Sequence, residues 1–263
     1  MRAKPSTKVG ERGTISMTET EMTTRFFTDT GIEVPAVTAA QMREVDRIAV
    51  EETGPNLWQM MENAGRSLAL LAIDVLGKDW EEARVVVLAG SGGNGGGGIC
   101  AARHLANRSM HVRLCLADPS HLGEIPAMQR KIFRQTSGKE VEVASLREEP
   151  AELILDALIG YGLKAAPRGT VAELIRWANA MHAPILALDM PSGVEATTGQ
   201  TPGEFSRPRW TLTLALPKTG LSPETTGDLW LADIGIPEGT YHRMSLAYTA
   251  PFGGRFWVPL VCR

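Results

Sequence analysis

The sequence has few features of a membrane, secreted or nucleic-acid-binding protein. No apolar run reaches the roughly 20 residues that a membrane-spanning helix needs. The polar N-terminus has no continuous apolar segment of the kind found in secretory signals. Three cysteines among 263 residues are too few and too scattered for a disulfide framework or a zinc cluster. The formal net charge of −3 argues against nucleic-acid binding through bulk charge. We therefore expect a reduced, cytoplasmic protein that binds neither membranes nor nucleic acids.

The chain does contain a regular alternation of predicted helices and strands. Residues 1–36 are polar and aperiodic, so we expect a flexible N-terminal extension. Thr38 and Gln41 fit a capping box that begins a helix, and Gly54 is placed to end it. A second helix is predicted from about Asn56 to Leu76. Strands are then expected at 84–89, 111–117, 141–143, 153–158, 184–189, 210–216 and 228–234, and helices at about 98–108, 124–136 and 169–181.

Strands that alternate with helices predict right-handed crossovers and a parallel sheet covered on both faces. We therefore predict an α/β fold: a three-layer, Rossmann-like, doubly wound and mostly parallel sheet, with two N-terminal helices before the first core strand. No internal repeat or linker divides it. The predicted organisation is one domain at 37–240 between the extension and a C-terminal tail at 241–263, which has no clear structural pattern.

A run of glycines follows the first core strand, at Gly90–Gly98. Between a strand and a helix, residues without a Cβ let an anionic group approach free backbone amides, so the loop suits a phosphate. The run formally satisfies G-x-G-x-x-G, and Asp118 ends the next strand, where a dinucleotide-binding Rossmann protein keeps its ribose-binding acid. A tight structural connector is the simpler alternative. No Gly-Lys-Ser/Thr follows, which excludes a Walker-type loop.

Polar residues also follow two other predicted strands. Asp156 ends one strand, and Asp189 ends another and leads into Ser192. Since ligands of open α/β sheets bind beyond the carboxyl ends of the strands, we expect these residues and Asn94 to share one rim. Each aspartate alone has a structural explanation as a turn former or helix cap. Lys218 could pair with Asp189 or hold an anion. The simpler expectation is a solvated surface charge. His104 is expected to be a surface or packing residue, and no His, Cys and acid spacing suggests a transition-metal site.

Taken together, these segments resemble the NAD(P)H-hydrate epimerase family, the YjeF N-terminal domain. The similarity spans about 41–237, nearly the whole predicted domain, and it is carried by an ordered set of motifs. These are QMREVD at 41–46, MENAGR at 61–66, the glycine-asparagine loop, AARHL at 101–105, DALIGYGL at 156–163, LDMPSG at 188–193, PKTGL at 217–221 and ADIGIP at 232–237.

The resemblance implies an isomerase that interconverts the R and S epimers of hydrated NADH and NADPH. It implies Asp189 as the catalytic acid/base and one K⁺ per subunit, bound by Asn94, Asp156 and Ser192. It also implies a homodimer. The substrate-binding residues that it implies are Gly93, Asn94, Gly95, Gly96, Gly97, Gly160, Tyr161, Gly162, Leu163, Lys164, Ala165, Ala166 and Asp189.

The loop departs from the family pattern in one respect. Where the family usually has Asn-Asn-Gly-Gly-Asp-Gly, this chain has Gly93-Asn94-Gly95-Gly96-Gly97-Gly98, so an asparagine and an aspartate are both glycine. The missing amide and carboxylate leave open a non-catalytic nucleotide-binding or scaffold module on the same fold. An NAD-linked oxidoreductase that uses Asp118 is a further alternative, although no hydride-transfer apparatus stands out.

Overall fold

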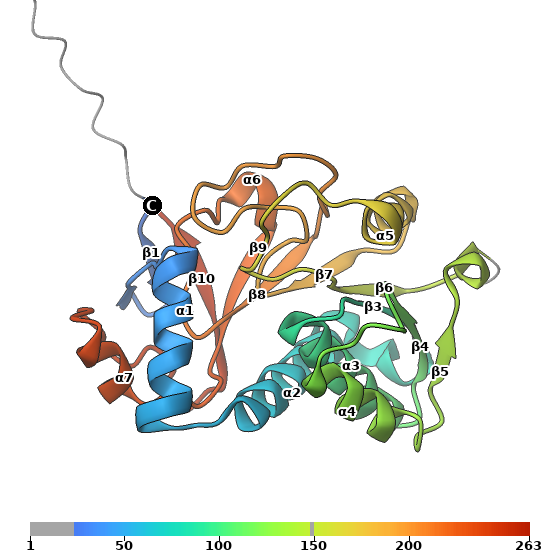
Figure 1. Cartoon of the computed structure of the whole chain (residues 1–263), viewed down its shortest axis with the longest axis horizontal. Coiled ribbons are helices and arrows are strands. Elements are labelled where there is room, and N and C mark those ends of the chain that lie inside the picture. Colours follow the sequence, from blue (N-terminus) through green and yellow to red (C-terminus); the bar gives the residue numbers. More distant parts are fainter. Residues whose placement is uncertain (1–23, 148–149) are drawn as a thin grey trace, which may run out of the picture.

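A ten-stranded sheet forms the middle layer of the computed structural model, which describes residues 24–147 and 150–263 (Figure 1). Its parallel strands are β3 (Arg84–Ala89), β4 (His111–Leu116), β5 (Lys139–Val141), β6 (Leu153–Ala157), β7 (Ile185–Leu188), β8 (Trp210–Leu214) and β9 (Asp228–Ala232). Three antiparallel strands, β1 (Phe26–Thr28), β2 (Glu33–Val34) and β10 (Trp257–Cys262), extend one edge. The order across the sheet is β2-β1-β10-β9-β8-β7-β6-β3-β4-β5.

Helices cover both faces of the parallel strands, as predicted. On one face lie α2 (Leu57–Leu76), α3 (Gly93–Ala106) and α4 (Glu124–Phe133), and on the other lies α5 (Gly169–Ala180) (Figure 1). Strand β3 shows why its apolar run is continuous: Val85 and Val87 pack with the first set of helices, and Val86 and Leu88 with the second. The predicted fold class is confirmed.

The two N-terminal helices begin where their capping residues predict. Helix α1 (Ala39–Ile48) starts at Thr38, whose Oγ1 accepts a hydrogen bond from the Gln41 amide at 3.2 Å, while the Gln41 side chain accepts one from the Thr38 amide at 2.8 Å. Asn56 caps α2 in the same way through Gln59. Both helices precede β3 in the chain, and both hold their apolar faces against the sheet.

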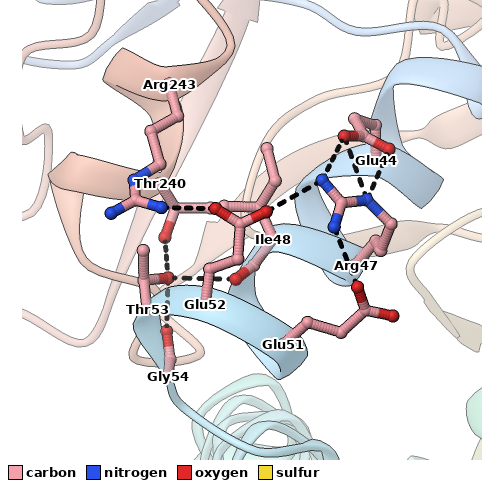
Figure 2. Close-up of polar contacts among 9 residues, drawn as sticks. All are labelled: Glu44, Arg47, Ile48, Glu51, Glu52, Thr53, Gly54, Thr240 and Arg243. Atoms are coloured by element: carbon pink, nitrogen blue, oxygen red, sulfur yellow. Dashed lines mark hydrogen bonds and ion pairs between the residues drawn. The ribbon is translucent and has the colours of Figure 1, made fainter.

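A network of ion pairs joins the end of α1 to the short helix α7 (Glu238–Arg243) (Figure 2). Arg47 bonds Glu44 and Glu51 on its own side, and Glu52 links Arg47 to Arg243 on α7. Below these charges the hydroxyls of Thr53 and Thr240 lie 2.6 Å apart. The network holds α7, in the segment after β9, against the end of α1. The remaining short helix, α6 (Pro223–Thr226), precedes β9 in the chain.

Both predicted terminal segments contain strands that the sequence pattern did not reveal. Residues 26–28 and 33–34, within the expected flexible extension, form β1 and β2, and residues 257–262 of the tail form β10. Phe26 pairs with Cys262, so each end of the described chain supplies the partner of the other. The prediction of an unstructured extension is therefore wrong for these strands. Residues 1–23 lie outside the described residues.

The third helix begins earlier than its sequence suggests. Helix α3 starts at Gly93, with Gly92 as its N-cap, whereas the pattern predicts a start near Gly98. Glycine is a poor helix former, but close packing requires it here. A Cβ at Gly95 would lie 1.9 Å from the Gly90 carbonyl oxygen, and one at Gly98 would lie 2.4 Å from the Ala157 Cβ. Tertiary packing therefore overrides helix propensity in this turn.

Over the described residues, no helix is both long enough and apolar enough to cross a lipid bilayer.

Candidate functional site

Three neighbouring strands deliver the predicted polar residues to one rim. Strands β3, β6 and β7 are adjacent and parallel, so the residues that follow them meet at the same edge of the sheet. Gly160, in the loop after β6, marks the meeting point. A Cβ placed on it would lie 2.8 Å from Asp189 Oδ2 and 3.1 Å from Asn94 Oδ1. The predicted convergence of Asn94 and Asp189 on this loop is what the structure shows.

Asp189 is held in a fixed position at the end of β7. Its backbone has φ +67°, a left-handed conformation that costs a non-glycine residue roughly 1–2 kcal/mol. The side chain is almost fully buried. Oδ2 accepts a hydrogen bond from the Tyr161 amide at 2.9 Å, and Oδ1 accepts one from the Leu214 amide at 3.4 Å. A strained residue whose carboxylate is surrounded by donors suits a functional role better than a turn former.

Lys218 is the charged partner of this carboxylate. Its Nζ donates to Asp189 Oδ1 and to the Leu214 carbonyl oxygen, the latter at 2.9 Å, and its side chain is fully buried. The simpler expectation of a solvated surface charge is therefore wrong. A lysine in a Pro-Lys-Thr-Gly segment has no apolar periodicity to reveal its burial, whereas the contact is plain once β7 and β8 pair.

Asp156 and Ser192 form a second polar pair beside the first. Asp156 Oδ2 accepts from the Ser192 amide at 2.9 Å, and its Oδ1 accepts from the Ser192 hydroxyl at 2.6 Å. The Ser192 hydroxyl in turn accepts from the Ile159 amide at 2.9 Å. Complete burial raises the pKa of the Asp156 carboxyl above its ordinary value, against the effect of the Ser192 donors. The pair joins the loop after β6 to the loop after β7.

The glycine loop presents a small number of atoms to this rim. Ser91, Gly92 and Gly93 are exposed and Asn94 is half-buried, whereas Gly95, Gly96, Gly97 and Gly98 are buried in the first turns of α3. The first intrahelical bond runs from the Gly96 amide to the Gly92 carbonyl oxygen, so the amides before it are available to an anion. The Asn94 side-chain nitrogen is buried and has no hydrogen-bond partner among residues 24–147 and 150–263.

The two departures from the family loop differ in their surroundings. A Cβ at Gly93 meets only the Met61 sulfur, at 4.0 Å, so this position is open. A Cβ at Gly97 would lie 2.8 Å from Leu188 Cδ2 and 3.9 Å from the Ala64 Cβ. A side chain at 97 would therefore point into the interior between α2 and β7. Glycine in place of the family's aspartate at position 97 therefore changes the packing between α2 and β7. It does not change the rim carboxylates of Asp156 and Asp189.

The segment after β6 runs along the rim from Gly160. Tyr161 is half-buried, and Leu163 is buried beneath the loop. Gly162, Lys164 and Ala165 are exposed and Ala166 is half-buried, so the rest of this predicted substrate segment lies at the surface. The Tyr161 amide, which donates to Asp189 Oδ2 at 2.9 Å, connects this segment to the carboxylate. Asp118 follows β4 and is half-buried, and its Oδ1 accepts hydrogen bonds from the amides of Ser120 and His121.

Sequence reasoning missed one acidic residue next to the rim. Asp46 on α1 accepts a hydrogen bond from the Tyr161 hydroxyl. Burial raises the pKa of the Asp46 carboxyl, and burial together with the Asp46 carboxylate holds the pKa of Tyr161 well above its ordinary value. The signal was present: Asp46 falls within the apolar face of α1 made by Met42, Val45 and Ala49.

A separate cluster lies between α2 and α3, where the sequence predicts no transition-metal site. The side chains of Glu62, Cys100 and His104 place one potential ligand atom each within 4.8 Å of one another. Arg103 already supplies a cation to them: its Nη2 donates to Glu62 Oε1 at 2.7 Å and to the Cys100 sulfur at 3.2 Å. Burial raises the pKa of the Cys100 thiol to about 12. We interpret the cluster as an ion-pair contact between two helices.

Comparison with known proteins adds to this geometry. The family model for the YjeF-related protein N-terminus matches residues 58–220. The NAD(P)H-hydrate epimerase of Dehalogenimonas lykanthroporepellens is 51% identical over 240 residues, which cover 91% of this chain and 98% of that protein. The bifunctional NAD(P)H-hydrate repair enzyme Nnr of Moorella thermoacetica is 34% identical over 86% of this chain, which spans only 44% of that protein. Yeast ynu0 shares the fold, with a TM-score of 0.72 at 20% identity over 82% of this chain and 97% of that one.

Proposed function

Because the chain belongs to the family of the YjeF-related protein N-terminus, we propose that it is an isomerase that interconverts the R and S epimers of hydrated NADH and NADPH. The similarity to an epimerase over almost the full length of both chains supports this reaction. The observation that carries the proposal in the structure is the buried Asp189 carboxylate at the rim, next to the exposed amides of the glycine loop.

The reaction needs a group that gives up a proton and takes one back. The reacting carbon bears a hydroxyl beside the ring nitrogen. When the hydroxyl is protonated, water leaves as the nitrogen lone pair forms a double bond to carbon, and water that adds to the other face then loses a proton. Asp189 is the residue that we assign to both transfers. Lys218 and the Tyr161 amide hold its two oxygens in place.

The rest of the site would bind and orient the dinucleotide. The amides at the start of α3 and the exposed surface of Gly92 and Gly93 suit a pyrophosphate, because they combine unpaired N–H groups with the positive end of a helix. Gly160 lies between Asn94 of the glycine loop and Asp189, and it has no side chain to block the space between them. The substrate can therefore approach the carboxylate along the backbone.

We expect the Asp189→Asn variant to lose at least about 100-fold in rate, the minimum usually supplied by a general acid/base. The measurement is conversion of the purified R epimer of hydrated NADH into the S epimer, followed by chromatography. The matched control is Asp228→Asn, at an exposed aspartate that begins β9 and therefore lies at the opposite edge of the sheet. Wild-type protein that does not exceed the spontaneous rate would reject the proposed function, and an active Asp189→Asn variant would reject the assignment of Asp189.

We also propose one K⁺ per subunit, held by Asn94, Asp156 and Ser192. Carboxylate, hydroxyl and amide oxygens are the donors that hard cations take. Two observations support the fit: Asp156 and Ser192 are buried and bonded to each other, and the Asn94 Oδ1 oxygen faces the same loop, 3.1 Å from a Cβ placed on Gly160. When bound, the ion supplies a positive charge that compensates the buried carboxylate.

Thermal unfolding in KCl and in tetramethylammonium chloride at equal ionic strength tests this site without an activity assay. We expect K⁺ to raise the melting temperature of the wild type, because an ion that binds only the folded state stabilises it. The Ser192→Ala variant should lose this difference. An equal response of both proteins would overturn the assignment of the ligands.

The family resemblance extends the proposal to a homodimer in a reducing compartment. Cys100 and Cys115 are free and buried, and Cys262 is free and half-buried, which suits such a compartment. Light scattering coupled to size-exclusion chromatography measures the mass of the particle, and a monomer at micromolar concentration would contradict the dimer.

A further inference from the structure

Tyr161 makes three contacts, of which the proposed proton transfer uses only the bond from its amide to Asp189. Its backbone amide donates to Asp189 Oδ2 at 2.9 Å, and its ring lies 5.9 Å from the Lys218 ammonium. Its hydroxyl donates to Asp46 Oδ2 on α1, 115 residues earlier in the chain. Tyr161 therefore contacts Asp189 through its amide and lies near Lys218 through its ring, while its hydroxyl bonds a third residue, Asp46.

The loop that carries Tyr161 is held before it by the bond from the Ile159 amide to the Ser192 hydroxyl and after it by the buried side chain of Leu163. Residues 158–168 form neither helix nor strand. Gly160 and Gly162 flank Tyr161 and have no side chains with which to anchor the backbone. Between these two points the Tyr161 side chain is the anchor nearest to the Tyr161 amide, so we expect the way it is fixed to affect the bond from that amide to Asp189.

Asp46 is placed to do this. It lies on the apolar face of α1, where an acidic side chain is costly unless a partner satisfies it. The described partner of its carboxylate is the Tyr161 hydroxyl. Helix α1 is itself fixed at its start by the Thr38 capping box and at its end by the Arg47 network. The acceptor is thus mounted on a rigid element.

We propose that Asp46 is a positioning residue that fixes the Tyr161 side chain and thereby keeps the Tyr161 amide on the Asp189 carboxylate. It acts through Tyr161 and touches no reacting atom. Its catalytic consequence rests on the proposed epimerase function, whereas its effect on the loop does not.

Hydrogen exchange of the full chain without substrate tests the loop directly. In Asp46→Ala and in Tyr161→Phe, the Tyr161 amide should exchange about tenfold faster, because one hydrogen bond holds the side chain in each case. Asp46→Asn keeps an acceptor oxygen and should recover most of the protection. The matched control is Glu44→Ala, which removes another carboxylate from α1 but contacts Arg47 and not Tyr161.

The epimerase assay then tests the catalytic consequence. Asp46→Ala and Tyr161→Phe should each lower kcat about tenfold with little change in KM, and the double variant should be no slower than either, since both remove the same hydrogen bond. Losses that multiply in the double variant, or unchanged exchange of the Tyr161 amide in Asp46→Ala, would overturn the positioning role. A wild type without epimerase activity would reject the proposed function, and hydrogen exchange would still decide whether Asp46 fixes the loop.

Discussion

At the scale of single residues, Gly160 allows Asp189 and Asn94 to approach the same piece of backbone. Any side chain at this position would enter the space between Asp189 Oδ2 and Asn94 Oδ1. The carboxylate is buried and held by several donors, so it has little freedom to move aside.

Gly160→Ala should therefore reduce epimerase activity by about tenfold or more, because displacements of the order of 1 Å at a reacting group can cost about 100-fold. The matched variant is Gly162→Ala in the same loop, where a Cβ meets nothing within 4 Å and the loss should be smaller. The measurement is kcat/KM for the R epimer. Equal losses in the two variants would mean that the space beside Asp189 is not the cause.

The buried ion pair of Lys218 with Asp189 leads to a prediction about the free energy of unfolding. Lys218→Met should destabilise the protein by about 3–5 kcal/mol, since removal of one partner leaves the Asp189 charge buried without compensation. The double variant Lys218→Met/Asp189→Asn should recover part of this loss because it removes the charge as well. Urea unfolding measures both. If the single variant is as stable as the wild type, the pair contributes nothing to folding.

The sequence predicted individual rim residues well because strand ends are marked in it. Asp156 and Asp189 both follow short apolar runs, so their meeting at one edge is a consequence of parallel pairing. Lys218 lies in the loop after β8, and Asp46 lies on α1, which α2 separates from the first core strand along the sequence. Their contacts with Asp189 and Tyr161 depend on tertiary packing that no local pattern encodes.

At the scale of elements, α2 and α3 are joined by the contact of Glu62 with Arg103 and His104. Burial acts to raise the pKa of Glu62, but the hydrogen bonds from Arg103 and His104 outweigh it and lower the pKa from 4.5 to about 2. A carboxyl whose pKa is lower in the folded state stabilises the fold above its unfolded pKa, and this contribution is lost as the pH falls toward the folded value.

Glu62→Gln should therefore weaken the dependence of stability on pH between about 4.5 and 2. The loss of stability at neutral pH should be below about 1 kcal/mol, because 44% of the Glu62 side chain is exposed and water screens the pair. Urea unfolding at a series of pH values provides the measurement, with Glu81→Gln at an exposed position as the control. Parallel curves for wild type and Glu62→Gln would contradict this role.

The elements also show where local patterns stop being informative. The capping box of Thr38 and Gln41 identified the start of α1, because a cap is a local interaction, and the structure shows a second such box at the start of α2. The predicted start of α3 is too late, because four glycines in a row contradict helix propensity and are explained only by close tertiary contacts, such as those of Gly95 with Gly90 and of Gly98 with Ala157.

At the scale of the whole molecule, the two ends of the described chain close the sheet together. Strand β10 lies between β1 and β9, and its residues Val258 and Leu260 are buried. Strands of three and two residues, such as β1 and β2, have no periodicity of their own, so the pairing of β1 with residues more than 200 positions away could not be inferred from the sequence.

A chain that ends at residue 255 should lose about 3–6 kcal/mol, from burial of about 1.5–3 kcal/mol for each of Val258 and Leu260. It should also associate through the newly exposed edge of β9. Urea unfolding and light scattering measure the two effects. As a matched pair, Leu260→Ala should destabilise the protein, whereas Val261→Ala, at a side chain that is 49% exposed, should change stability by less than about 0.5 kcal/mol.

The pairing of Arg25 with Arg263 has a practical consequence for how the protein can be handled. The backbone amide of each donates to the carbonyl oxygen of the other. Leu260 pairs with Leu229 near the start of β9, so Cys262 lies past the edge at which the parallel strands begin. Asp189 follows a strand at the opposite edge, and Arg25 and Arg263 therefore lie at the far side of the sheet from it. A biotin, a fluorophore or a fused reporter attached beside either residue would thus lie at the edge of the sheet opposite the rim. A surface coated in this way would display every molecule with its rim facing the solution.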